Sequence, residues 1–547
     1  MKTKYIFVSG GVISGIGKGV TAASIGFLLK SAGYKVSPIK FEGYLNIDAG
    51  TINPIEHGDV FVCDDGTEAD MDIGTYEKFL DQNMSKDNFV TMGQIYKTII
   101  DRERRFEYHG EDVEAIHICD EIISRIKKLA NKDQSDIVII ELGGTAGEYW
   151  NVFFYEASRI LSVKNQGDVI HLHVSYVPTP KHLGEPKTKP TQLSVRTLNS
   201  MGIQPDFIIT RSEKYIDQRR RDRFALYCNM NGEDIISNPD LKTVYEVPII
   251  LEKQALTQKI LNKLGLNVRK PQLEPLENLV NNIKSEKKPI NIAIVGKYFG
   301  TGDYQLRDSY AALFDAIDHA CWQLGYGPKT YWIDAEQVET KGRSMIGKPD
   351  GIIVPIGWGE RGAEGMIGAA SYARKNNIPY LGLCYGMQLA VVAFARDILG
   401  WKDANTTENN PKTNSPVIHF VPGQEKKVKK RAYGGTMRLG AWNAKIKKNT
   451  LAFSIYKKEI VSERHRHRWE FNDRYLKDFE KNSLIISARS TVENLCEIIE
   501  LPKSQHPFYF ATQSHPEYKS RPLNPHPVFL SFIAAGGRFH EEKLHLG

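Results

Sequence analysis

Short apolar runs alternate with longer amphipathic segments through the first half of this chain, and this rhythm constrains its fold more than any other feature. The runs have the length of strands and lie at residues 5–8, 36–41, 137–142, 169–174 and 207–209. The segments between them have the length of helices. Because strands that alternate with helices form a parallel sheet with helices on its faces, the rhythm predicts a doubly wound α/β fold.

The same rhythm begins again at Ile290, after a stretch that interrupts it. New apolar runs lie at 290–296, 330–333, 351–354 and 379–384, whereas residues 270–289 contain three prolines and many charges. A chain of 547 residues is also too long for one ordinary core. We therefore expect two mainly parallel α/β domains at 1–270 and 290–547, joined by a linker at 271–289. We expect the polar stretches 406–415 and 422–431 to be surface loops.

Composition narrows the classes of function. Hydrophobic residues make up 41% and charged residues 25% of the chain, and no apolar run approaches the ~18 residues of a membrane span. The first residues lack a signal-peptide core, so we expect a cytoplasmic protein without a membrane partner. The net charge of +7 is spread among interleaved acids and bases, which gives little support for nucleic-acid binding. Six cysteines without any C-x-x-C pair argue against structural zinc or disulfides.

The segment SGGVISGIGKGVTAAS follows the first apolar run and opens a helix-length segment. Glycines in this position can direct backbone N–H groups and a helix N-terminus at phosphates, and Lys18 adds positive charge. The segment departs from the strict G-x-x-x-x-G-K-[ST] pattern, because Gly19 replaces the hydroxyl residue that would bind magnesium. A glycine turn that only packs a strand against a helix is the alternative, but Lys18 and the flanking elements favour a phosphate loop.

Magnesium at such a loop needs oxygen ligands from elsewhere in the chain. Glu141 ends the apolar run DIVIIE, where the side chain projects from the carboxyl edge of the sheet, and Asp72 in EADMDIG is the second candidate. Either acid alone is more often a solvated loop residue or helix cap. In GEPKTKPTQ, Lys187 and Lys189 lie two residues apart, so an extended backbone would point both toward a triphosphate. A solvated basic loop explains this segment equally well.

A cysteine in the second half lies in a G-x-C-x-G turn, within IPYLGLCYGMQ. This pattern is typical of a nucleophile elbow, and a helix N-terminus beside Cys384 favours its thiolate, although most buried cysteines are inert. TQSHPEY supplies His515 as a base and Glu517 to orient it. The glycines of IIVPIGWGERG can supply N–H donors to an oxyanion. Together these residues indicate acyl transfer from an amide.

The chain as a whole resembles the CTP synthase family, in which a P-loop amidoligase domain is fused to a class I glutamine amidotransferase domain. The segments that carry the resemblance are GGVISGIGKG, NPIEHGDVFV, ELGGTAGE, GEPKTKPTQ, GIQPDFIITRS, RGAEGMI, GLCYGMQ, GGTMRLGA, ERHRHRWE and SHPEY. The resemblance implies that ATP phosphorylates O4 of UTP with Mg²⁺, and that ammonia from glutamine travels through an internal passage and displaces the phosphate to give CTP. It also implies activation by GTP, inhibition by CTP and a homotetramer.

The resemblance assigns roles to individual residues of this sequence. Catalysis falls to Cys384, His515, Glu517, Lys18 and Lys40, and the metal to Asp72 and Glu141. ATP would contact Gly15, Ile16, Gly17, Lys18, Gly19, Val20, Asp72, Pro239, Asp240 and Leu241. UTP and CTP would contact Ser14, Glu148, Tyr149, Trp150, Lys187, Thr188, Lys189, Pro190, Thr191, Gln192 and Arg223. Glutamine would contact Gly357, Tyr385, Gly386, Met387, Gln388, Glu408 and Arg468. The GTP effector would contact Arg361.

This sequence departs from the family pattern at several positions. Residues 147–150 read G-E-Y-W where the family usually has G-D-I-E, so we expect weaker inhibition by CTP. Ile356 replaces the first glycine of a P-G-G-F-G turn; a positive φ there would strain isoleucine, yet we expect glutaminase activity to survive. Arg223 replaces a lysine. His109 replaces a leucine, and the stretch 300–302 is unusual, which bears on activation by GTP.

Two other functions are compatible with parts of this pattern. One is a P-loop amidoligase that aminates a carboxylate or a modified pyrimidine; the lysines of GEPKTKPTQ favour a triphosphate substrate instead. The other is a catalytically weak nucleotide-binding or filament-forming homologue, suggested by Trp150 and Ile356. The intact Cys384, His515 and Lys18 argue against that function. In HRHR, before Trp469, we expect one contact to the glutamine carboxylate and structural salt bridges, with no metal.

Overall fold

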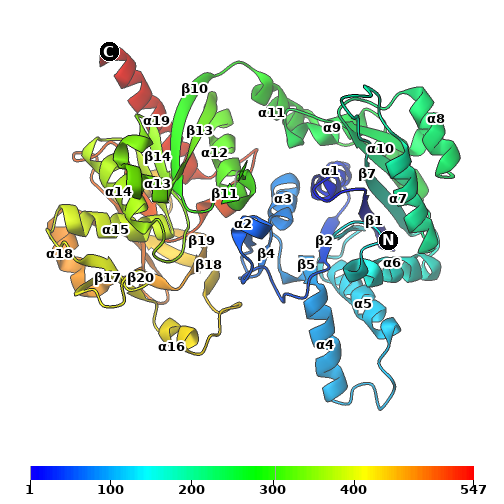
Figure 1. The fold of residues 1–547 in the computed structure, drawn as a ribbon, viewed down its shortest axis with the longest axis horizontal. Helices are drawn as coiled ribbons and strands as arrows, with labels where there is room; N and C mark the ends of the chain where they lie inside the picture. Colours follow the sequence, from blue (N-terminus) through cyan, green and yellow to red (C-terminus); the bar gives the residue numbers. More distant parts are fainter. Residues whose placement is uncertain (1, 302–303, 547) are drawn as a thin grey trace. The chain divides into compact units, whose positions relative to one another are not determined.

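The computed structural model describes residues 2–301 and 304–546, and it separates into two compact units (Figure 1). The first unit contains the residues up to Ile47 together with Asp72–Lys284. The second contains Asp48–Met71 together with the residues from Ser285 onward. The excursion Asp48–Met71 thus packs with a unit that lies more than 200 residues further along the chain. The expected first domain, 1–270, contains this excursion, whereas the structure groups it with the second unit. The domain boundaries at 270 and 290 stay a prediction.

A parallel sheet forms the centre of the first unit. Its strands, in spatial order, are β5 (Phe89–Thr91), β2 (Val36–Glu42), β6 (Ile137–Leu142), β1 (Lys4–Gly11), β7 (Val169–Tyr176), β8 (Phe207–Ser212) and β9 (Ile235–Pro239). The helices are α1 (Lys18–Ser31), α3 (Met71–Leu80), α4 (Met92–Arg104), α5 (Ala115–Asp133), α6 (Val152–Lys164), α7 (Lys189–Ser200), α8 (Gln218–Tyr227), α9 (Val247–Glu252), α10 (Leu256–Lys263) and α11 (Glu274–Lys284). The expected doubly wound α/β fold is confirmed here.

Alternation of side chains along the strands explains why both faces of this sheet carry helices. On β1, Tyr5 and Phe7 pack in a cluster with residues of α4, α5 and α6, while Ile6 and Val8 point to the other face and are also buried. On that other face, α1 packs on β6, since a Cβ on Gly26 would meet Ile139. A strand that is buried on both faces reads as a continuous apolar run, which is the pattern found in the sequence.

The second unit has a mixed sheet, parallel in one half and antiparallel in the other. The parallel half comprises β13 (Tyr326–Asp334), β10 (Lys288–Gly296), β14 (Gly351–Val354), β15 (Tyr380–Leu383) and β23 (Tyr509–Thr512). The antiparallel half continues with β22 (Cys496–Glu500), β21 (Ile485–Ser490), β18 (Arg438–Ile446) and β19 (Ile460–His467). On β10, Ile292 and Ile294 join one apolar cluster, and Ala293 and Val295 join another, so this sheet also has two covered faces.

Smaller elements complete the second unit. The short strands are β3 (Val60–Val62), β4 (Glu68–Asp70), β11 (Gly300–Thr301), β12 (Tyr304–Gln305), β16 (Ala404–Thr406), β17 (Ser415–Phe420) and β20 (Trp469–Phe471). The helices are α2 (Pro54–His57), α12 (Ala311–Gln323), α13 (Ala335–Lys341), α14 (Ala363–Lys375), α15 (Tyr385–Asp397), α16 (Gln424–Lys429), α17 (Leu451–Tyr456), α18 (Leu476–Lys481) and α19 (Pro527–Leu546). Across residues 2–301 and 304–546, the helices are all too short or too polar to cross a membrane.

Two stretches that looked irregular in the sequence contain helices. The expected surface loop at 422–431 was wrong in this respect, because it forms α16, which begins after Gly423 in a left-handed conformation (φ 83). The expected linker includes α11, whose Leu276, Leu279 and Val280 are buried. These three residues follow helical spacing, i, i+3 and i+4, and pack one face of the helix.

Candidate active sites

The phosphate loop connects β1 to α1 in the first unit. Gly15 (φ 71) and Gly17 (φ 86) adopt left-handed conformations that glycine accepts without strain. Gly17 is the N-cap of α1 and has no side chain with which to cap the first N–H groups, so these groups and the helix dipole suit an anion. Lys18 is buried and lies against Gly10, where a Cβ would stand 2.5 Å from the lysine Cδ. Burial lowers the pKa of Lys18.

The two candidate metal carboxylates converge beside the first turn of α1. Asp72 on α3 and Glu141 on β6 both pair with Lys40, whose Nζ lies 2.9 Å from Glu141 Oε1. A third carboxylate, Glu42, lies 3.0 Å from the same ammonium. A Cβ on Gly19 would stand 2.3 Å from Asp72 Oδ1 and 3.5 Å from Glu141 Oε2. The absence of a side chain at Gly19 therefore lets the carboxylates approach the loop.

This set of oxygen donors fits a hard divalent cation such as Mg²⁺. Burial raises the pKa of Glu141 even though Lys40 opposes that effect, so a second positive charge would be stabilising there. Burial alone would lower the pKa of Lys40, but Asp72, Glu141 and Glu42 together raise it well above its ordinary value. Lys40 is thus a fixed cation among the carboxylates. The phenol of Tyr76, which the sequence analysis did not single out, donates a hydrogen bond to Glu141.

A pocket of about 130 Å³ lies beside the phosphate loop. Five predicted ATP positions line it: Gly15, Ile16, Gly17, Val20 and Leu241. Arg211, at the end of β8, also lines it and donates to the backbone oxygens of Asn238 (2.8 Å) and Pro239 (2.9 Å) and to Asp240 Oδ1 (3.0 Å). Arg211 therefore holds the 238–240 stretch in place, a role for which the sequence carried no signal.

A larger pocket of about 630 Å³ gathers the predicted triphosphate residues. It is lined by Lys187, Thr188, Lys189, Gln192 and Arg223, as expected, and also by Glu185, Pro186, Arg196, Arg219, Arg220 and Tyr227. The additional arginines of α8, Arg219 and Arg220, precede Arg223 in the run QRRRDR, and no sequence pattern pointed to them. A concentration of cations in one concave surface suits a polyphosphate.

Other predicted nucleotide positions lie outside the lining of this pocket. Ser14 is exposed in the phosphate loop, and Thr191 is buried and donates to Tyr176 O (3.2 Å). Glu148 accepts hydrogen bonds from Thr145 N (2.8 Å) and Oγ1 (2.6 Å). Tyr149 and Trp150 follow it with 91% and 67% exposure, and Pro190 lies in the first turn of α7. Their roles stay predictions.

The cysteine of the second unit occupies a strained elbow between β15 and α15. Cys384 has φ 53 and ψ −100, a conformation that is costly for any residue other than glycine. Both flanking glycines are required by close packing. A Cβ on Gly386 would stand 1.9 Å from Val354 O, and one on Gly382 would stand 2.9 Å from the Gly386 backbone. The G-x-C-x-G spacing thus holds the sulfur at the N-terminus of α15, as the pattern indicates.

The base and its orienting group lie beyond β23. His515 Nδ1 is 2.7 Å from Glu517 Oε1, and both side chains are buried. Burial by itself would lower the pKa of His515, but Glu517 and the sulfur of Cys384 raise it to about 10. An imidazolium beside the sulfur favours a thiolate–imidazolium pair, the reactive form of a cysteine nucleophile.

A pocket of about 550 Å³ lies next to the elbow and is lined by Glu408 and Arg468, two predicted glutamine contacts. Its other lining residues are Gly50, Thr51, Ile52, Asn53, Pro54, Trp358, Val428, Tyr433, Met437, Arg466 and Trp469. Burial raises the pKa of Glu408 to about 7, and the carboxylate accepts from Gly359 N (2.8 Å). Arg468 donates to Gln424 Oε1 and to Tyr433 O, both at 2.6 Å. The excursion Asp48–Met71 therefore supplies one wall, which sequence reasoning missed.

The other predicted glutamine contacts surround the elbow rather than this pocket. Gly386 and Met387 are buried in α15, and Gln388 donates to Trp469 O (2.9 Å). Tyr385 donates to Gly359 O (2.8 Å), and a Cβ on Gly357 would stand 3.1 Å from the Tyr385 ring.

The loop after β14 carries the expected oxyanion donors. Ile356 is not among the residues with positive φ; the left-handed residues of this loop are Gly359 (φ 70) and Gly362 (φ 69), so the anticipated strain at Ile356 is absent. Lys297 holds the loop by donating to Trp358 O (2.8 Å) and Gly359 O (2.5 Å), a contact that the sequence did not reveal. Burial lowers the pKa of Lys297 to about 8.

The second unit contains the predicted GTP contact Arg361 and the arginine-rich run before Trp469. Arg361 pairs with Glu336 and donates to Lys297 O (3.0 Å). The unusual stretch 300–302 ends at Gly302, which lies outside the described residues. In HRHR (residues 465–468), an expected structural salt bridge is confirmed, because Arg466 pairs with Glu68 (2.7 Å). Arg464, just before this run, pairs with Asp64 (2.6 Å).

Comparisons with known proteins give two family matches along the chain. The model for the CTP synthase N-terminus matches residues 4–266, and that for class-I glutamine amidotransferase matches residues 305–535. Curated proteins named CTP synthase from Pyrococcus furiosus (48% identical) and Pyrococcus abyssi (47%) each align over 544 residues, 99% of both chains. One from Sulfolobus acidocaldarius is 47% identical over 97% of this chain and 99% of its own.

One solved structure, the glutaminase domain of Trypanosoma brucei CTPS with bound acivicin, is 36% identical to this chain. It covers 46% of this chain and 94% of its own, with a TM-score of 0.42.

Fold and matches together define a class: a glutamine amidotransferase fused to a nucleotide-dependent amidoligase. With relatives nearly half identical over almost the full length, the chain belongs to the CTP synthase family. It is accordingly an ATP-dependent carbon–nitrogen ligase that converts UTP to CTP with glutamine as nitrogen donor.

Proposed function

We propose that the reaction proceeds through UTP phosphorylated on O4. The γ-phosphate of ATP is transferred to O4, so that one O–P bond forms as the bond to ADP breaks. Ammonia then attacks C4, a proton is lost, and inorganic phosphate leaves with O4 to give CTP. The observation that supports this sequence is the convergence of Asp72 and Glu141 on Lys40 beside the first turn of α1, a charge arrangement suited to phosphoryl transfer.

Asp72 and Glu141 would hold Mg²⁺, which when bound neutralises the phosphate charge that develops during transfer. Lys18 extends along the phosphate loop and would stabilise the transferred group, while Lys40 would stabilise the negative charge on O4. The cation-lined pocket at Lys187 and Lys189 would take the triphosphate of UTP.

In the second unit, we propose that the Cys384 thiolate attacks the glutamine amide. His515 gives a proton to the departing ammonia, and water then hydrolyses the thioester to glutamate. Glu517 keeps the imidazole oriented through its 2.7 Å contact. Glu408 and Arg468 have the charges to hold the α-amino and α-carboxylate groups of glutamine. The ammonia would reach the first unit within the protein.

Regulation and assembly belong to the same proposal. GTP would activate the glutaminase through a site that includes Arg361, CTP would inhibit weakly, and the active species would be a homotetramer. The domain boundaries at 270 and 290 and a cytoplasmic location complete it.

Isotope transfer tests the phosphorylated intermediate. UTP carrying a heavy oxygen isotope at O4 is incubated with ATP, Mg²⁺ and ammonium, and the products are separated and weighed by mass spectrometry. The proposal predicts heavy inorganic phosphate in an amount equal to the CTP formed. Heavy isotope found in water instead of phosphate would contradict the proposal, because O4 would then have left without ever being bonded to phosphorus.

A further inference from the structure

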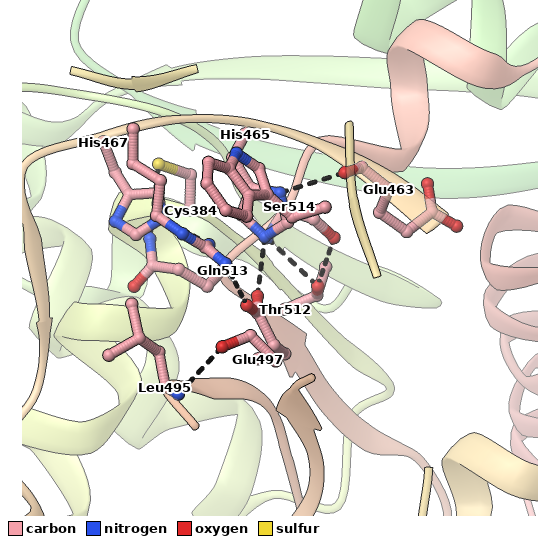
Figure 2. A network of polar contacts seen from close by, with 12 residues as sticks. Cys384, Glu463, His465, His467, Leu495, Glu497, Thr512, Gln513 and Ser514 are labelled. Atoms are coloured by element: carbon pink, nitrogen blue, oxygen red, sulfur yellow. Dashed lines mark hydrogen bonds and ion pairs between the residues drawn. The ribbon is translucent and has the colours of Figure 1, made fainter. Parts of the chain in front are cut away.

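The sulfur of Cys384 has a polar neighbour that belongs to neither the base nor the elbow. Gln513 Nε2 lies 3.6 Å from Cys384 Sγ, within hydrogen-bond range for sulfur, and Figure 2 shows the amide beside the cysteine. Cys384 also faces the backbone oxygen of Arg466 at 3.6 Å. Gln513 is only 1% exposed and lies just after β23, two residues before His515. The amide therefore contacts the reacting atom from within the protein.

The orientation of this amide is fixed by a second glutamine. Gln388 Nε2 donates to Trp469 O (2.9 Å), which identifies that atom of Gln388 as the nitrogen, and it also donates to Gln513 Oε1 (3.3 Å). With its oxygen engaged by Gln388, Gln513 must present its NH₂ group to the sulfur. A donor, and not an acceptor, thus faces Cys384.

The backbone that carries Gln513 is anchored in a buried charge network (Figure 2). Gln513 N donates to Glu497 O (2.8 Å) on β22. The Glu497 carboxylate in turn lies 2.6 Å from His465 Nε2 and 2.8 Å from Arg438 Nη2. This buried network fixes the strand to which the backbone of Gln513 is hydrogen-bonded, and it thereby restrains the position of the amide.

We propose that Gln513 is a catalytic residue that donates a hydrogen bond to the Cys384 thiolate, and this proposal rests on the proposed glutaminase function. A buried thiolate requires hydrogen-bond donors, whereas the sulfur of a thioester accepts only weakly. The contact therefore stabilises the free thiolate relative to the acyl-enzyme. It makes the sulfur a better leaving group when water hydrolyses the thioester.

Iodoacetamide alkylation of Cys384 against pH tests the donor, with Cys384→Ala protein as the blank for the other cysteines. Two variants are compared: Gln513→Met removes donor and acceptor, and Gln513→Glu removes the donor but keeps the acceptor for Gln388. A hydrogen bond to a charged group contributes about one pH unit or more, so the alkylation midpoint should rise by about one unit in Gln513→Met and further in Gln513→Glu. In both variants glutamine-driven synthesis falls about tenfold or more, whereas ammonia-driven synthesis is unchanged.

The native titrating groups near the sulfur are the same in all three proteins, and Gln513→Glu adds one carboxyl group to them. They are His515, Glu517, Arg466, Tyr518 and Asp59. Because Cys384 and His515 share a proton, the alkylation midpoint describes the pair and not the cysteine alone. The difference in midpoint between variants still reports the effect of residue 513, because the pair is the same in each protein.

A purely structural role would give a different result. If Gln513 only anchors Gln388, the neutral variant Gln513→Met would keep the wild-type midpoint, which overturns the proposal. If Gln513→Met fails to fold, an unchanged midpoint in Gln513→Glu overturns it, because that variant replaces a donor by a carboxylate. The proposed function fails separately, if Cys384→Ala retains glutamine-driven synthesis.

Discussion

Gly19 is the position where one methyl group should uncouple the two halves of the reaction. In Gly19→Ala, the added Cβ would stand 2.3 Å from Asp72 Oδ1, whereas ordinary contact begins at 3.4 Å, so the carboxylate must retreat by about 1 Å. The clashing atom is the end of a side chain, and the helix can therefore form with the carboxylate displaced. Because misplacing a catalytic group by about 1 Å costs roughly 100-fold in rate, we expect CTP formation to fall about 100-fold.

The assay follows CTP formation from UTP and ATP with ammonium as nitrogen donor, over a range of Mg²⁺ concentrations, and glutamine hydrolysis separately. Gly26→Ala is the matched control on the same helix, since its Cβ would meet only the movable ends of Leu80 (3.1 Å) and Ile139 (3.4 Å). The control should keep the wild-type rate, and both variants should hydrolyse glutamine normally. Wild-type CTP formation and Mg²⁺ dependence in Gly19→Ala would refute the placement of Asp72 at the metal.

Three further predictions concern inhibition, pH and the oxyanion loop. Trp150→Glu, which restores the acid usual in the family, should tighten inhibition by CTP about tenfold, and an unchanged inhibition constant would contradict this. The raised pKa of His515 contributes stability that is fully present below pH 6.5 and is lost as the pH rises through about 10. The unfolding temperature of wild type should therefore exceed that of Glu517→Gln by an amount that shrinks across this range. A difference that stays constant with pH would disprove the coupling. Lys297→Met loosens the loop at Gly359 and should raise the KM for glutamine about tenfold without affecting ammonia-driven synthesis, and equal loss of both activities would argue against it.

Local patterns in the sequence were sufficient for the sheet cores and the elbow. The apolar runs at 5–8 and 137–142 form β1 and β6, because strands buried on both faces need continuous apolar sequence. The G-x-C-x-G spacing predicted the tight turn at Cys384, since only glycine fits at positions 382 and 386.

Features that depend on distant packing were not predictable. The excursion Asp48–Met71 joins the second unit through contacts such as Arg466 with Glu68, which are almost 400 residues apart. Lys297 and Gln513 make contacts with residues distant in the sequence, which leave no periodic pattern. Ile356 seemed strained only because the sequence does not specify which residues of a glycine-rich loop take positive φ.

The rate of CTP formation by Cys384→Ala with each nitrogen donor tests most directly whether glutamine hydrolysis and UTP amination occur at separate sites. Purified variant and wild type receive UTP, ATP and Mg²⁺, with either glutamine or ammonium, and the CTP formed is quantified by nucleotide separation. Synthesis from glutamine should disappear in the variant, while synthesis from ammonium should match wild type. Loss of both, or survival of the glutamine-driven reaction, would contradict a cysteine that only releases ammonia for a separate phosphoryl-transfer site.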